Sequence, residues 1–376
     1  MQLTVCKLRA FYSQQRLCHD SMLLKALLLA STVSSLALPP PEADLQALLS
    51  TPLTIIRDDP SGTPPTKQPQ KPSDDDDDDD APIPVILWHG LGDASNAEGL
   101  QATADLIEEV HPGTYVHLIT ATSAPDDRSA SFFGNVTEQI DTVCAALLAD
   151  PILSTAPAVD AVGFSQGGQF LRGYIERCNN PPVRSLLTFG SQHNGISAFE
   201  KCKSATDFVC HAANALLKSS TVWSHYVQSH VVPAQYYRDS DDYENYLNYS
   251  NFLADVNNER PRKNDTYKHN LASLDNFVMV VFEDDQTVIP KESGWFAQVN
   301  TTSGDVTELR DREIYKEDWI GLRTLDEKGG LRFETVEGEH MRLKEKDLKR
   351  LFGEYFGPET TKTGLGRVVD EMKTDL

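Results

Sequence analysis

Ser165 is the residue whose neighbours most clearly predict chemistry. It is the central residue of Gly-Phe-Ser-Gln-Gly at positions 163–167, which fits the G-x-S-x-G pattern of a nucleophilic serine on a sharp strand-to-helix turn. Small residues two positions before and after the serine let strand and helix approach closely around a strained backbone. The pattern alone also fits a glycine-rich turn with an ordinary serine. The apolar run before it and the helical pattern after it favour a nucleophile, beside a helix N-terminus where developing negative charge is stabilised.

A histidine that follows Ser165 is needed as the base that takes the serine proton. In open α/β sheets with this turn, the groups follow one another along the chain as serine, acid and histidine. The histidines after Ser165 are His193, His211, His225, His230, His269 and His340. If the acid follows the apolar run at residues 276–282, only His340 comes after it, and we predict that His340 is the base.

Three carboxylates end that apolar run: Glu283, Asp284 and Asp285. Each could accept a hydrogen bond from an imidazole, so position alone leaves the acid open among them. The tetrahedral intermediate of acyl transfer also needs backbone N–H donors. We predict that one is the N–H of Gln166 and the other is the N–H of Leu91, in the glycine-rich loop after the first strand.

Alternating apolar runs and helical patterns must position these residues. Strands are predicted at residues 83–88, 115–119, 158–164, 183–190, 276–282 and 331–336, and helices near 98–109, 135–149, 169–178 and 344–355. Such alternation is typical of a mostly parallel sheet with helices on both faces.

The alternation stops between residues 191 and 274, a polar, helical stretch rich in aromatic residues. We interpret this stretch as a cap insertion over the carboxyl edge of the sheet. Its aromatic side chains either line an apolar acyl groove or pack against one another in a small helical layer. Residues 357–376 are predicted to be a loose C-terminal tail.

The amino-acid composition limits the classes of partner and ligand that we expect for this chain. The formal net charge is −22, and seven of the acidic residues form the run at positions 74–80. Such a surface repels phosphate backbones, which argues against a nucleic-acid partner. The chain has no C-x-x-C pair, which argues against a zinc site, and we predict no metal and no cofactor.

The N-terminal region predicts entry into the secretory pathway. Residues 1–37 form a signal peptide with an N-terminal extension, with a short apolar run and a cleavage site at Ala37; Met22 is an alternative start. An anchor helix is the alternative, but the apolar run is short for a bilayer and no later stretch could span one. Residues 38–81 are rich in Pro, Ser, Thr and Asp and are predicted to be a disordered linker. Within it, we interpret the acidic run at residues 74–80 as a solvated spacer, and the alternatives are a loose cation site or part of a propeptide. N-glycosylation sequons lie at Asn135, Asn248, Asn264 and Asn300.

The residues around Ser165 resemble a known family. Residues 163–172 are similar to the nucleophile turn of palmitoyl-protein thioesterases, the lysosomal depalmitoylating enzymes. Further segments resemble that family in the same order along the chain, at residues 88–93, 252–260, 282–290 and 337–340. The resemblance covers residues 82–356 and implies an α/β-hydrolase catalytic domain.

The resemblance also assigns site residues. It places the catalytic triad on Ser165, Asp285 and His340, since Asp285 keeps the family's spacing to a following valine and proline. It places the oxyanion donors on Leu91 and Gln166, although the family typically has methionine at position 91. A backbone donor is indifferent to that exchange.

The resemblance further implies disulfides between Cys144 and Cys178 and between Cys202 and Cys210. The implied activity is hydrolysis of palmitoyl and other long-chain fatty acyl thioesters on protein cysteines, through an acyl-serine intermediate. The implied substrates are S-palmitoylated proteins or peptides, in a lysosome or vacuole or outside the cell. Two alternatives stay open: a lipase or esterase that cleaves oxygen esters, and a non-catalytic lipid-binding glycoprotein on the same fold.

Overall fold

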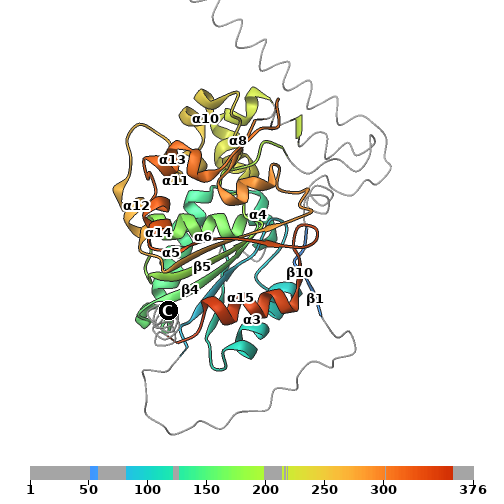
Figure 1. Cartoon of the computed structure of the whole chain (residues 1–376), viewed down its shortest axis with the longest axis vertical. Helices are drawn as coiled ribbons and strands as arrows, with labels where there is room; N and C mark the ends of the chain where they lie inside the picture. The colour runs from blue at the N-terminus through green and yellow to red at the C-terminus, as the bar shows by residue number, and fades with distance from the viewer. Residues whose placement is uncertain are drawn as a thin grey trace, which may run out of the picture. The chain divides into compact units, whose positions relative to one another are not determined.

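A parallel sheet organises the molecule (Figure 1). The computed structural model describes residues 51–57, 82–121, 127–198, 214, 215, 217, 219–300 and 302–358. The sheet has the strand order β3-β2-β4-β5-β6-β9, and each neighbouring pair is parallel. The strands are β2 (Val85–Trp88), β3 (Val116–Leu118), β4 (Val159–Phe164), β5 (Val183–Phe189), β6 (Asn276–Phe282) and β9 (Leu331–Val336).

Helices cover both faces of the sheet, because each inner strand sends alternate apolar side chains to opposite sides. In β2, Val85 and Leu87 face one layer, whereas Ile86 and Trp88 face the other. The first layer contains α3 (Glu98–Val110) and α15 (Glu345–Tyr355). The second contains α5 (Val136–Ala149), α6 (Gln166–Arg177), α12 (Asp265–Ala272) and α14 (Leu322–Glu327). The expected fold class, an α/β-hydrolase with a largely helical cap, is therefore confirmed.

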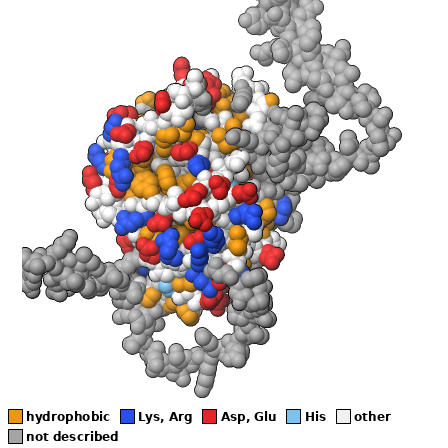
Figure 2. Space-filling model, turned by 45° about the vertical axis from the view of Figure 1, so that its right-hand side comes forward, with side chains coloured by type: hydrophobic (Ala, Val, Ile, Leu, Met, Phe, Trp, Pro, Cys, Tyr) orange, Lys and Arg blue, Asp and Glu red, His pale blue; other side chains and the backbone are white. Residues whose placement is uncertain are grey.

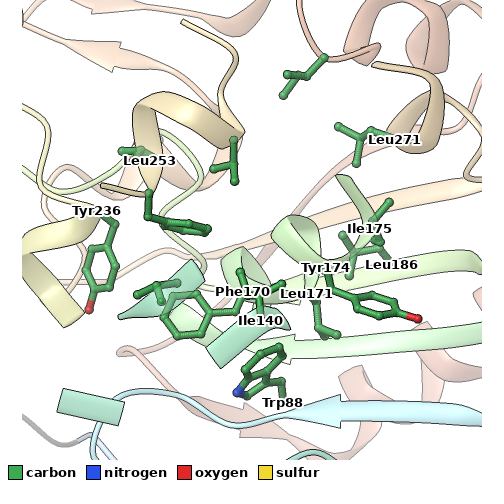
Figure 3. Close-up of a cluster of buried hydrophobic side chains, with 14 of the residues drawn as sticks. Trp88, Ile140, Phe170, Leu171, Tyr174, Ile175, Leu186, Tyr236, Leu253 and Leu271 are labelled. Atoms are coloured by element: carbon green, nitrogen blue, oxygen red, sulfur yellow. The ribbon is translucent and has the colours of Figure 1, made fainter. Parts of the chain in front are cut away.

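The second layer also supports the cap. Figure 3 shows Phe170 of α6 at the centre of this apolar cluster. Its ring packs edge-on against Trp88 of the sheet, with centroids 5.5 Å apart, and against Phe252 of the cap, at 5.8 Å. The cluster therefore ties the cap to the sheet through one helix.

Short helices make up the described part of the cap. They are η3 (Ser220–Trp223), α8 (His225–His230), α9 (Val232–Gln235), α10 (Tyr243–Tyr249) and α11 (Leu253–Val256). α12 packs on α6, so it belongs to the helical layer and the insertion ends earlier than residue 274. Trp223 packs on Tyr237 and Tyr246, with centroids 5.6 and 6.3 Å away, so these three aromatic side chains cover one another.

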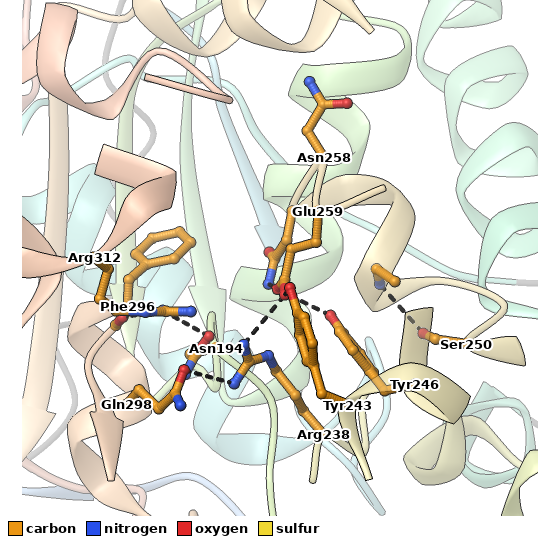
Figure 4. Close-up of polar contacts among 12 residues, drawn as sticks. Asn194, Arg238, Tyr243, Tyr246, Ser250, Asn258, Glu259, Phe296, Gln298 and Arg312 are labelled. Carbon is orange, nitrogen blue, oxygen red and sulfur yellow. Dashed lines mark hydrogen bonds and ion pairs between the residues drawn. The ribbon is translucent and has the colours of Figure 1, made fainter. Parts of the chain in front are cut away.

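A buried polar network fixes the cap to the segment after β6 (Figure 4). That segment contains η4 (Lys291–Trp295), β7 (Gln298–Val299), β8 (Val306–Thr307), η5 (Leu309–Asp311) and α13 (Glu313–Lys316). Arg238 of the cap donates to Glu259 at 3.2 Å and to Gln298 at 3.3 Å. Burial alone would raise the pKa of Glu259, but the charges of Arg238 and Arg312 outweigh it and lower the pKa to about 2. Glu259 is thus an ionised, buried counter-charge.

Residues 51–57 depart from the disordered linker that the sequence predicts. They contain β1 (Thr54–Ile56), which pairs in parallel with β10 (Arg342–Lys344). The physical reason is local composition: Leu53 is apolar and buried, and Ile55 packs against the same cluster, so this short stretch has apolar surface to bury. The expected signal peptide, the acidic run and the tail beyond residue 358 lie outside the described residues.

The cysteines and sequons are only partly described. A disulfide joins Cys144 of α5 to Cys178 at the end of α6, whereas Cys202 and Cys210 lie outside the described residues. Three sequon asparagines are exposed: Asn248, Asn264 and Asn300. The fourth, Asn135, is half-buried and caps α5 by accepting from the Thr137 N–H.

The described surface carries charges of both signs. On the face in Figure 2, acidic and basic side chains lie interspersed among apolar ones. Within the described part of the chain, none of the helices is both long and apolar enough to span a bilayer.

Candidate active site

Ser165 occupies a strained turn between β4 and α6. Its φ is 52° and its ψ is −124°, in a region that residues with a side chain rarely adopt. A Cβ on Gly163 would lie 2.2 Å from the Gly168 Cα, and a Cβ on Gly167 would lie 2.3 Å from the Trp88 carbonyl oxygen. The two glycines of the pattern are therefore required by close backbone approach on either side of the serine. α6 begins at Gln166, three residues earlier than the sequence predicts.

His340 and Asp285 lie beside this serine, although 175 and 120 residues of chain separate Ser165 from them. The His340 Nε2 is 3.1 Å from the Ser165 Oγ, and the His340 Nδ1 is 2.7 Å from the Asp285 Oδ2. All three side chains are buried or nearly so. When Nδ1 donates its proton to Asp285, the lone pair of Nε2 faces the serine hydroxyl, the arrangement in which imidazole can accept the serine proton.

Asp285 is held in place by the turn that follows β6. Its Oδ1 accepts from the N–H groups of Thr287 and Val288, at 2.9 and 3.0 Å, which leaves Oδ2 directed at His340. Glu283 and Asp284 are exposed. Of the three carboxylates that sequence position left open, Asp285 is the one that contacts the imidazole.

His340 lies in the base loop, residues 337–341, between β9 and β10. The Phe282 ring packs edge-on against its imidazole, with centroids 5.7 Å apart. The next residue, Met341, has a φ of 60° and is buried. The backbone directly after His340 therefore has a conformation that its surroundings must hold in place.

The other candidate histidines that the structure describes do not reach the serine, and His211 lies outside the described residues. His193 is fully buried, bonds to Thr188 at 3.0 Å and stacks on Phe296, with centroids 5.0 Å apart. Burial, followed by the charge of Arg172, holds the pKa of His193 well below its usual range, so it is a neutral structural residue. The histidines of the cap and of α12 that are described, namely His225, His230 and His269, are exposed.

The two predicted oxyanion donors border the serine. Among the described residues, neither the Leu91 N–H nor the Gln166 N–H has a hydrogen-bond acceptor. The Gln166 side chain donates to the Ser131 carbonyl at 3.1 Å and accepts from the Tyr236 hydroxyl at 3.1 Å. These contacts tie the start of α6 to the cap and leave the backbone N–H available for a developing oxyanion.

Asp127 supports the loop that carries Leu91, and sequence reasoning missed it. Its carboxylate accepts from His89 at 3.1 Å and from the N–H groups of Ser95 and Ala121, at 2.9 and 3.1 Å. Burial alone would raise the pKa of Asp127, but the hydrogen bond and charge of His89 outweigh it and lower the pKa to about 2. Asp127 begins α4 (Asp127–Phe132), far from any recognised motif, so no local signal marked it.

A cavity of about 40 Å³ lies over the serine hydroxyl. Its walls include Leu91, Gln192, Ile196, Tyr236, Val288 and, from the N-terminal segment, Thr51. Most of these side chains are apolar, and the Oε1 of Gln192 is buried without a hydrogen-bond partner among the described residues. The volume suits the reacting carbonyl group and is far below the roughly 300–1,000 Å³ of a typical ligand pocket. No cluster of metal-ligating side chains occurs among the residues that the structure describes.

Comparisons with known proteins agree with the resemblance. A family model described as Palmitoyl protein thioesterase matches residues 84–340. The chain is 38% identical to palmitoyl-protein thioesterase 1 of Caenorhabditis elegans, over 69% of this chain and 87% of that protein. It is 34% identical to palmitoyl-protein thioesterase 3 of Dictyostelium discoideum, over 68% and 84%. It is 29% identical to the lysosomal thioesterase PPT2 homolog of Drosophila melanogaster, over 66% and 82%.

Proposed function

The chain belongs to the palmitoyl protein thioesterase family, and on that premise we propose that it removes long-chain fatty acyl groups from protein cysteines. It is a thioester hydrolase, and Ser165, His340 and Asp285 are its proposed catalytic residues. The observation that carries these roles is the pair of hydrogen bonds that joins the three side chains in order, at 3.1 and 2.7 Å. The preferred acyl group is proposed to be palmitoyl.

The proposed reaction has two steps. The Ser165 Oγ attacks the thioester carbonyl while His340 takes its proton, and the N–H groups of Leu91 and Gln166 stabilise the oxyanion. The cysteine thiolate leaves and accepts a proton from the imidazolium, which yields an acyl-serine and free thiol. A water molecule activated by His340 then attacks the acyl-serine, and the fatty acid and the serine hydroxyl are released. Since cysteine thiols have a pKa near 8.5, the thiolate is a good leaving group and depends little on the proton from the His340 imidazolium.

The cavity is consistent with a substrate that is bound mainly outside it. Its apolar walls, Ile196, Tyr236 and Val288, suit the first methylene groups next to the carbonyl. A sixteen-carbon chain exceeds this volume, so it must extend along the surface or displace part of the cap. The proposed substrates are therefore S-palmitoylated proteins or peptides and other fatty acyl thioesters, with no cofactor.

We also propose that the chain acts in the secretory pathway, in a lysosome or vacuole or outside the cell. The signal-peptide pattern supports this location, and so does the disulfide between Cys144 and Cys178, since disulfides persist in oxidising compartments. Relatives that are themselves named lysosomal thioesterases favour the lysosome or vacuole. Co-fractionation of the chain with cytosolic markers, and no change in its mass after enzymatic deglycosylation, would argue against this location.

One assay tests the activity. An S-palmitoyl peptide and its oxygen-ester analogue are compared as substrates, with Ser165→Ala as the control. We expect faster cleavage of the thioester and loss of activity in the variant. Faster cleavage of the oxygen ester would instead identify a lipase or esterase. Lipid binding without cleavage of either substrate would identify a non-catalytic lipid-binding protein.

A further inference from the structure

We propose that residues 51–57, here called the strap, are a positioning element of the catalytic centre. The strap holds the base loop, and with it His340, in the orientation needed to accept the Ser165 proton. This inference rests on the proposed function of the serine and histidine. It assigns a role in catalysis to a segment that lies N-terminal to the region matched by the family model, residues 84–340.

The strap is bonded directly to the residue that follows the base. The Thr54 N–H donates to the Met341 carbonyl oxygen at 2.9 Å. From there β1 continues in register with β10, with Thr54 opposite Arg342 and Ile55 opposite Leu343. Among the strands that the structure describes, β1 is the only pairing partner of β10. The strap therefore supplies the hydrogen-bonded ladder for the chain immediately after His340.

The backbone at this point needs support. Met341 has a φ of 60°, in the left-handed region that a bulky side chain adopts only where the surroundings hold it there. Its side chain is buried in the same apolar cluster as Leu53 of the strap. The hydrogen bond from Thr54 and the packing of Leu53 thus act together on the residue whose conformation orients the imidazole.

The strap also reaches the reacting groups. Thr51 lines the cavity that contains Ser165 and His340. Leu53 lies against the first turn of α3, where a Cβ on Gly99 would be 2.1 Å from the Leu53 carbonyl oxygen. The absence of a side chain at Gly99 is therefore what allows the strap to lie against α3 while it pairs with β10.

These contacts predict a specific kinetic defect when the strap is displaced. The base loop relaxes at Met341 and the His340 Nε2 moves away from the Ser165 Oγ. Since a 1 Å misplacement of reacting groups can cost about 100-fold in rate, we expect kcat to fall by about that factor. KM should change much less than kcat, because the strap contributes only Thr51 to the described lining of the cavity, whereas Ile196, Tyr236 and Val288 still form the acyl-facing walls.

The test displaces the strap without altering a catalytic side chain. In the full chain, Gly99→Ala adds one methyl group against the Leu53 carbonyl, and alanine is favourable in a helix. Its matched control is Gly353→Ala on α15, where a Cβ meets only Val110 at 3.8 Å and the strap is untouched. A second pair is Thr54→Pro, which removes the N–H donor to Met341, and Thr54→Ala, which keeps it.

Two readouts are measured on all four variants: kcat and KM for an S-palmitoyl peptide, and the rate of covalent labelling of Ser165 by a fluorophosphonate. We expect a large fall in kcat and in labelling rate for Gly99→Ala and Thr54→Pro, and near-parental values for Gly353→Ala and Thr54→Ala. Parental kcat in Gly99→Ala and Thr54→Pro, or a fall in Gly353→Ala and Thr54→Ala as large as theirs, would overturn the proposal. A parental chain that labels but does not cleave the thioester would refute the proposed substrate, while the labelling rates would still decide the role of the strap.

Discussion

Replacing Asp285 with asparagine should switch the imidazole of His340 to the wrong tautomer. The Asp285 Oδ1 already accepts two backbone N–H bonds, from Thr287 and Val288. An asparagine at this position keeps its carbonyl oxygen on those donors, so its NH₂ group must point at the His340 Nδ1. Nδ1 then becomes an acceptor, Nε2 carries the proton, and the imidazole can no longer accept a proton from Ser165.

The size of the effect follows from the same geometry. Turning the amide around would restore an acceptor for Nδ1 but leave the buried Val288 N–H unpaired, at roughly 1–3 kcal/mol, and with it the part-buried Thr287 N–H. The wrong tautomer is therefore the stable one. The equivalent change in a serine protease lowers kcat by about 10⁴-fold, which corresponds to about 5.5 kcal/mol at 1.36 kcal/mol per decade, and we expect a similar loss here.

The assay is steady-state hydrolysis of an S-palmitoyl peptide, with thermal unfolding as a check on the fold. The matched control is Asp284→Asn, because Asp284 is the exposed neighbour of Asp285. Surface substitutions of this kind usually change stability by less than about 0.5 kcal/mol, and we expect kcat to stay close to the parental value. If Asp285→Asn kept kcat within about tenfold of the parent while remaining folded, the assignment of Asp285 as the orienting acid would be refuted.

Four further substitutions test the site and the contacts that hold the fold around it. Asp127→Asn should lower kcat more than it raises KM. Because the change only loosens the loop that carries Leu91, kcat should fall by less than the roughly 10²–10³-fold that the loss of a whole oxyanion donor costs. An unchanged kcat would contradict this role. Glu259→Gln should destabilise the fold by about 3–5 kcal/mol at pH 7, because it leaves a buried guanidinium unpaired, as thermal or urea unfolding can measure. With a folded-state pKa of about 2 against an ordinary value of 4.5, the ionised Glu259 stabilises the fold above pH 4.5, and this contribution disappears as the pH falls toward 2. The parental chain should therefore lose more stability over that pH range than Glu259→Gln, and equal losses would contradict the assignment. Cys144→Ser should cost about 2–4 kcal/mol of unfolding free energy, and Cys178→Ser should cost the same because both break one disulfide; unequal costs would indicate a role beyond the bond.

Much of the scaffold could be predicted from local sequence. The strands at residues 276–282 and 331–336 were predicted with the observed bounds, because each is a compact run bounded by polar or glycine residues. The turn at Ser165 was predictable because its steric demand fixes which residues can flank it. The order of serine, acid and histidine then singled out His340 without any structural information.

The alternation of strands and helices, the serine turn and the histidine after the last long strand could thus be predicted from local residue patterns. Local sequence left three adjacent carboxylates open, and the family resemblance pointed to Asp285. The folded chain supplies the physical reason, because two backbone N–H groups hold Asp285 so that it faces the imidazole. The contact of Asp127 with the loop that carries Leu91, and the pairing of residues 51–57 beside the base loop, became visible only in the folded chain. The parallel pairing of β1 with β10 joins segments almost 290 residues apart, and neither segment has a sequence pattern that predicts it. The reason is that the pairing uses backbone hydrogen-bonding groups, which nearly all residues have in common.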